Sequence, residues 1–131
     1  MSTQNPSEIS QDNSIVKITD LEELSRGNKN FIREMITLFM EQNPRDVNEI
    51  ETALGNTNYD KIRATAHRMK TSVGFMGMPT LAEPLNTIEM LAENKTNPEQ
   101  INTLFALVKH DCDRAMQELN HILTNLEKEK I

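Results

Sequence analysis

His67 is the residue whose neighbours in the sequence best fit it for chemistry. A helix turns by about 100° per residue, so His67 falls roughly opposite an apolar side formed by Ile62, Met69, Val73 and Met76. Its own side carries two cations and two very small residues, namely Arg63, Lys70, Ala64 and Gly74. We therefore expect an exposed imidazole over a low, electropositive surface. Such a site suits a nucleophile that another macromolecule must reach and that must carry a negatively charged group.

The charge around His67 differs from that of the whole chain. The formal net charge is −6 at pH 7, which argues against general nucleic-acid binding, because that requires Lys and Arg to neutralise phosphates. Between Asp60 and Lys70, however, one acid is opposed by four basic residues, which are Lys61, Arg63, Arg68 and Lys70. Runs of this kind are usually only solvated surfaces, but this one coincides with His67. The coincidence favours a functional interpretation.

The helix that contains His67 resembles a known family of signalling domains. The chain is similar to the histidine-containing phosphotransfer (HPt) domains of bacterial phosphorelays in the spacing of His67, Lys70, Gly74 and Gly77. The resemblance covers residues 18 to 119, and it includes the segments 31–40 and 58–60. It implies that His67 accepts a phosphoryl group from a receiver-domain aspartate and passes it to another receiver aspartate.

The resemblance also assigns expected roles to the neighbours of His67. A neutral imidazole is nucleophilic near neutral pH, since unperturbed histidine titrates at about 6.5. Lys70, one turn away, is placed to hold the phosphoryl oxygens, whereas Arg63 either assists or only keeps the surface soluble. The expected partner-docking residues are Arg63, Ala64, Thr71, Gly74 and Gly77.

Thr71 departs from the family pattern and keeps a second hypothesis open. The residue after the lysine is usually glycine in this family, which lets the partner's backbone approach, but here it is a β-branched threonine. The alternative is therefore a helical module that docks receiver domains without transferring phosphate. No Gly-rich nucleotide loop or receiver-type aspartate cluster is present in the sequence, so we expect no independent ATP-dependent kinase activity.

Composition limits the fold and the compartment. A chain of 131 residues with 37% hydrophobic residues fits one domain with one modest core, and four glycines and no tryptophan favour helices. The single cysteine, Cys112, falls at a core position and fits a reducing compartment. His110 and His121 lie opposite the apolar stripe of the last helix, so we expect no metal site and no cofactor. No apolar run approaches a membrane span, and we expect a cytoplasmic monomer.

Periodicity predicts an all-α fold, an antiparallel four-helix bundle with a short additional N-terminal helix. Residues 1–15 are expected to be a disordered leader or linker, and residues 16–131 to form the bundle. Thr19 is expected to cap the first helix through a capping box, and Gly27 is expected to end this helix. The four main helices are expected to run from Asn28 to Gly55, from Tyr59 to Met76, from Pro79 and from Pro98. Pro44 should bend the first of these, and Pro84 either delays or kinks the third.

Overall fold

The structure is a computed structural model that describes residues 14–129. In this range there are five helices and no strand, which confirms the all-helical class. The helices are α2 (Ile18–Ser25), α3 (Lys29–Gly55), α4 (Tyr59–Phe75), α5 (Pro79–Glu93) and α6 (Pro98–Glu129). Residues 1–13, most of the predicted leader, lie outside the described residues. Ile15 is already buried, so the ordered fold includes the last residue that we assigned to the leader.

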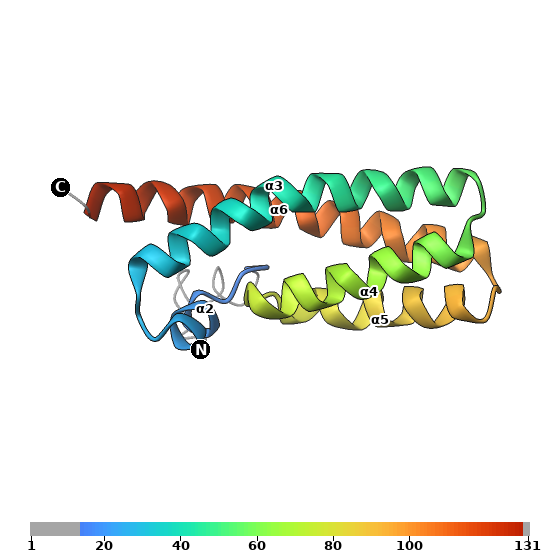
Figure 1. The fold of residues 1–131 in the computed structure, drawn as a ribbon, viewed down its shortest axis with the longest axis horizontal. Helices are drawn as coiled ribbons and strands as arrows, with labels where there is room; N and C mark the ends of the chain where they lie inside the picture. The colour runs from blue at the N-terminus through green and yellow to red at the C-terminus, as the bar shows by residue number, and fades with distance from the viewer. Residues whose placement is uncertain (1–13, 130–131) are drawn as a thin grey trace, which may run out of the picture.

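The four long helices form a closed ring of contacts. Each packs on the next along the chain, and α3 also packs on α6, so that α4 and α6 lie diagonally across the bundle. Figure 1 shows consecutive long helices running in opposite directions. The apolar side of each helix faces this common core, whose fully buried members include Ile36, Ile62, Leu85, Ile88, Ile101 and Leu119. Burying each such side chain stabilises the fold by about 1.5–3 kcal/mol relative to exposure.

The start of α2 differs from the prediction. The helix begins at Ile18, not after Thr19, and its N-cap residue Lys17 makes no side-chain capping bond. The backbone of Lys17 is instead tied to the α4–α5 turn, because its N–H donates to the carbonyl oxygen of Gly77 at 2.6 Å. The side chain of Glu118 on α6 accepts hydrogen bonds from the N–H groups of Ile15 and Val16. Tertiary contacts thus replace the local cap.

The two internal prolines leave their helices continuous. Pro44 lies inside α3, which curves along its length in Figure 1, and Pro84 lies inside α5. Since α5 already begins at Pro79, the alternative start near Glu83 is excluded. The last helix, α6, has 32 residues and extends beyond the ends of α4 and α5 (Figure 1). This extension is covered by the first turns of α3, where Arg33 pairs with Glu127 at 3.4 Å.

Candidate functional site

The helix α4 presents His67 to solvent as the periodicity predicted. Asn58 caps its N-terminus by accepting a hydrogen bond from the N–H of Lys61 at 3.2 Å. Its inner face is held in the core by residues including Ile62, Met69 and Val73. The imidazole of His67 is on the other side, with 61% of the side chain exposed. A second macromolecule can therefore reach the ring.

Glu89 on α5 contacts both His67 and Lys70. One carboxylate oxygen, Oε2, lies 2.9 Å from Nδ1 of His67, and the other, Oε1, lies 2.8 Å from Nζ of Lys70. The contact with Lys70 is an ion pair rather than a well-angled hydrogen bond. Lys70 Nζ also donates to Oδ1 of Asn86 at 3.0 Å. Glu89 and Asn86 were not predicted as site residues, because a contact between two helices produces no periodic pattern within the sequence of either helix.

The carboxylate of Glu89 is held in its charged form. Its side chain is 17% exposed, and burial raises the pKa of this carboxyl. The side-chain contacts and charges of Lys70 and His67 outweigh burial, so the pKa of Glu89 lies below its ordinary value. The positive charge of Lys70 is therefore matched by a negative charge beside the imidazole. The expectation of a simply electropositive surface around His67 is wrong at this point.

Two more of the predicted cations are paired with acids of α3. Arg68 Nη2 lies 2.8 Å from Oδ1 of the buried Asp46 and 3.3 Å from Oε2 of Glu49. The hydrogen bonds that Arg68 donates to Asp46 are the main reason that the pKa of Arg68 is raised. Lys61 lies 3.6 Å from Glu49. These ion pairs join α4 to α3 and explain most of the basic run without a functional role.

Arg63 is the exception within the basic run. It is half-buried, and it has no hydrogen-bond or ion-pair partner among residues 14–129. Because it lies four residues before His67, its guanidinium belongs to the same outer side of α4. Its charge is available to a group arriving at the imidazole.

Three of the predicted docking residues lie on the exposed side of α4. Ala64, Thr71 and Gly74 are all exposed. A Cβ atom added at Gly74 would have no atom within 4 Å, which confirms that this glycine faces open space. The Thr71 hydroxyl lies 3.4 Å from the carbonyl oxygen of His67 in its own helix. The surface beside the imidazole is thus low at position 74 and raised at position 71.

Gly77 is also a predicted docking residue, and it is placed differently from Ala64, Thr71 and Gly74. It is buried in the α4–α5 turn, with φ +69°, and a Cβ there would lie 2.8 Å from the carbonyl oxygen of Lys17. Glycine is needed at this position for its left-handed backbone and for the close approach of the α2 segment.

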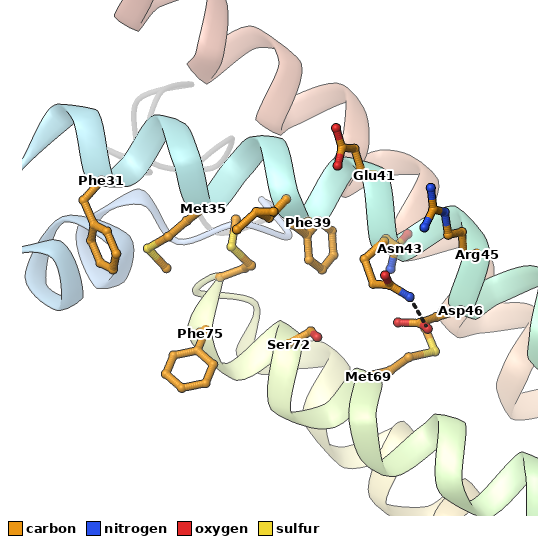
Figure 2. A pocket seen from close by; sticks show the side chains of 13 residues that line it. Phe31, Met35, Phe39, Glu41, Asn43, Arg45, Asp46, Met69, Ser72 and Phe75 are labelled. Atoms are coloured by element: carbon orange, nitrogen blue, oxygen red, sulfur yellow. Dashed lines mark hydrogen bonds between the residues drawn. The ribbon is translucent and has the colours of Figure 1, made fainter.

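An apolar groove between α3 and α4 was not predicted as a surface. Its volume is about 480 Å³, and its lining includes Phe31, Met35 and Phe39 of α3 and Phe75 near the end of α4 (Figure 2). Part of the apolar side of α3 is left uncovered by its neighbouring helices, since Phe31 is 46% exposed and Leu38 is 65% exposed. Phe75, 56% exposed, lies two turns beyond His67.

The remaining candidate residues lie away from this site. His110 and His121 are exposed on α6, diagonally across the bundle from α4. Burial raises the pKa of the Cys112 thiol to about 11, which fits a packing role. Within residues 14–129, no three His, Cys, Asp or Glu side chains are grouped as metal ligands would be. No helix in the described part of the chain is long and apolar enough to cross a membrane.

Comparisons with known proteins agree with this architecture. The family model of the Hpt domain matches residues 34–129, a range that contains His67, Lys70 and Glu89. The structure is similar to the crystal structure of an HPT domain from a hybrid sensor histidine kinase of Shewanella, with a TM-score of 0.72 and 19% sequence identity. That match covers 80% of this chain and 90% of the other. No curated protein sequence matches significantly.

Proposed function

The chain belongs to the Hpt domain family, whose members generally carry phosphoryl groups in phosphorelays, and we propose that its phosphoryl carrier is His67. In this proposal His67 takes the group from the aspartyl phosphate of one receiver domain and gives it to the aspartate of another. The observation that carries the proposal is the position of the imidazole, which is exposed on one side and held at Nδ1 by Glu89 on the other.

The contact with Glu89 selects the reactive nitrogen. A charged carboxylate can only accept a hydrogen bond, so the neutral imidazole carries its proton on Nδ1 and keeps its lone pair on Nε2. Nε2 then attacks phosphorus, the bond from phosphorus to the aspartyl oxygen breaks, and its electron pair returns to the carboxylate of the receiver. No base has to remove a proton during this step.

Lys70 and Arg63 are the cations placed to meet the charge of the transferred group. Phosphoryl transfer proceeds through a loose state whose charge is spread over the equatorial oxygens, so positioning and electrostatics provide most of the catalysis. Lys70 lies one helical turn from His67, and its Nζ is held between Glu89 and Asn86. Arg63 adds a second positive charge from the preceding turn.

We place receiver docking on the surface that runs from His67 past Thr71 and Gly74 to the apolar groove. The low position at Gly74 admits a partner's backbone, and the exposed Phe75 offers apolar area at the edge of the groove. Phe75→Ser should slow transfer from a receiver while leaving labelling by a small phosphoryl donor unchanged. Equal slowing of both reactions would contradict a docking role.

Labelling with two kinds of donor tests the function. Phosphoramidate, a small phosphoryl donor, should label the wild-type protein without docking, and a phosphorylated receiver domain should label it through docking. His67→Gln should fold normally and take no label from either donor, whereas His110→Gln and His121→Gln should behave as wild type. Comparable labelling of the His67 variant would exclude the proposed carrier. Labelling of wild-type protein by phosphoramidate, with every one of a panel of receivers binding but none transferring, would favour docking without transfer.

A further inference from the structure

Glu89 supplies more than a hydrogen-bond acceptor to the imidazole. An amide oxygen at the same place would also hold the proton on Nδ1 of a neutral ring. A carboxylate adds a full negative charge 2.9 Å from that nitrogen, and hydrogen bonds to ionised groups are roughly twice as strong as those between neutral groups. The added charge matters most when the ring itself becomes positive.

The ring becomes positive when His67 carries phosphate. Attack by Nε2 uses the ring's lone pair, and the proton stays on Nδ1, so the phosphorylated ring is an imidazolium as long as it keeps that proton. We propose that Glu89 is a positioning residue for the departure of the phosphoryl group, because it keeps the Nδ1 proton on phosphorylated His67. The proposal rests on His67 being the phosphoryl carrier.

The proton on Nδ1 determines how good a leaving group the imidazole ring is. When the phosphoryl group departs, the bond between Nε2 and phosphorus breaks, its electron pair returns to Nε2, and phosphorus bonds to an oxygen of the acceptor. With the proton retained on Nδ1, the leaving group is neutral imidazole. Without it, the leaving group is an imidazolate anion, which is far more basic and departs much more slowly. Glu89 thus keeps His67 able to donate.

The charged groups around the ring support this assignment. From α5, Glu89 is the acid that contacts the imidazole, and from α4 the nearby cations are Lys70 and Arg63. Arg68 and the α3 acids Asp46 and Glu49 are paired with one another. Lys70 contacts Oε1 of Glu89 and His67 contacts Oε2, so each cation has its own oxygen. Glu89 can therefore stabilise a positive ring without releasing Lys70.

The pH dependence of phosphate loss tests the proposal without any receiver. The full-length protein is labelled with phosphoramidate, the donor is removed, and transfer of the phosphoryl group from His67 to water is followed by ³¹P NMR. With Glu89 present, the rate should change less than about threefold between pH 6.5 and 8.5. In Glu89→Gln it should fall tenfold or more over this range, because the phosphorylated ring would no longer be held in its protonated form by a carboxylate.

Glu93→Gln provides a matched control, because it removes the same charge from an exposed position one turn further along α5. It should follow the wild type. Parallel pH profiles for wild type and Glu89→Gln would overturn the inference while leaving His67 as the carrier. Failure of wild-type protein to take label on His67 would instead overturn the proposed function.

A measurement on the wild type alone covers the case in which Glu89→Gln fails to fold. The ¹⁵N chemical shift of Nδ1 in phosphorylated His67 reports whether this nitrogen is protonated. It should show a protonated nitrogen up to about pH 8, the upper end of the range in which histidine side chains ordinarily change charge. Loss of the proton below pH 7 would contradict a retaining role for Glu89.

Discussion

At the scale of single residues, the ammonium group of Lys70 is held by two side chains of α5. It pairs with Glu89 at 2.8 Å and donates to Asn86 at 3.0 Å, with 30% of the side chain exposed. Lys70→Ala should therefore change stability by no more than about 1 kcal/mol, as is usual for partly exposed pairs.

The same substitution should slow phosphoryl transfer, since it leaves the charge of Glu89 beside the incoming phosphate uncompensated. We expect a cost of about 1–3 kcal/mol in the transition state, by analogy with hydrogen bonds to charged groups. Single-turnover labelling measures it. Lys61→Ala removes a cation of the same helix that faces Glu49 of α3, and it should transfer at the wild-type rate. An unchanged rate in Lys70→Ala would remove Lys70 from the mechanism.

Gly74 should show opposite effects on stability and transfer. Nothing lies within 4 Å of a Cβ built there, so Gly74→Gln should be neutral or stabilise the fold by up to about 1 kcal/mol through better helix propensity. The new side chain projects beside His67 and should slow transfer from a receiver but not labelling by phosphoramidate. Thermal unfolding and the two labelling rates measure these effects.

Gly55→Gln is the control for Gly74, because this glycine of α3 also faces open space. It should be tolerated and transfer normally. Wild-type transfer from a receiver in Gly74→Gln would show that the low surface beside His67 is not the docking surface.

Helical periodicity predicted which residues of α4 face outward, and His67, Ala64 and Gly74 are exposed as expected. It could not predict Glu89, which lies on another helix, 22 positions from His67. The register between α4 and α5 brings the two together, and that register depends on core packing and on the turn at Gly77. For the same reason the sequence overstated the positive charge that the basic run offers to a partner. Its ion-pair partners Asp46 and Glu49 belong to α3.

At the scale of elements, the α4–α5 turn is locked to the segment that begins α2. A Cβ at Gly77 would lie 2.8 Å from the carbonyl oxygen of Lys17, and the backbone there has φ +69°. Gly77→Ala should therefore destabilise the protein by about 2–4 kcal/mol, which combines backbone strain of about 1 kcal/mol or more with displacement of the α2 segment.

Gly27→Ala separates the two contributions to the cost at Gly77. Gly27 has a similar φ of +74° but open space around it, so its replacement should cost only about 1 kcal/mol. Chemical denaturation of both variants gives the difference. Equal costs would mean that the α2 segment moves aside without loss.

The prediction of elements succeeded where local signals agree with tertiary packing. Asn28 caps α3, which begins one residue after the predicted start, and Asn58 caps α4, which begins at Tyr59 as predicted. The capping box at Thr19 failed because a backbone hydrogen bond from Lys17 to Gly77 fixes the start of α2 two residues earlier. The exposed groove was also missed, because periodicity gives the width of the apolar band on α3 but not how much of it the neighbouring helices cover.

At the scale of the whole molecule, α4 is joined by ion pairs to both of its neighbours in the bundle. Glu49 of α3 pairs with Arg68 and Lys61, and Glu89 of α5 pairs with Lys70. Burial raises the pKa of Glu49 and of Glu89, but their hydrogen bonds and charge partners outweigh it, so the pKa of each lies below its ordinary value. Both carboxylates therefore favour the folded state when they are ionised.

The sign of the pH dependence follows from those lowered pKa values. A group whose pKa is lower in the folded state adds stability at pH values above its unfolded pKa, and this stability is lost as the pH falls through the folded pKa. The double variant Glu49→Gln/Glu89→Gln should thus be less stable than wild type at pH 7, and the gap should shrink as the pH falls from about 5 toward 3. Urea unfolding at a series of pH values measures the gap. Glu41→Gln/Glu93→Gln, which removes two exposed carboxylates, should lie close to wild type throughout. A gap that stays constant down to pH 3 would show that the two carboxylates act through packing rather than through their charge, and that α4 is held between its neighbours by its apolar side alone.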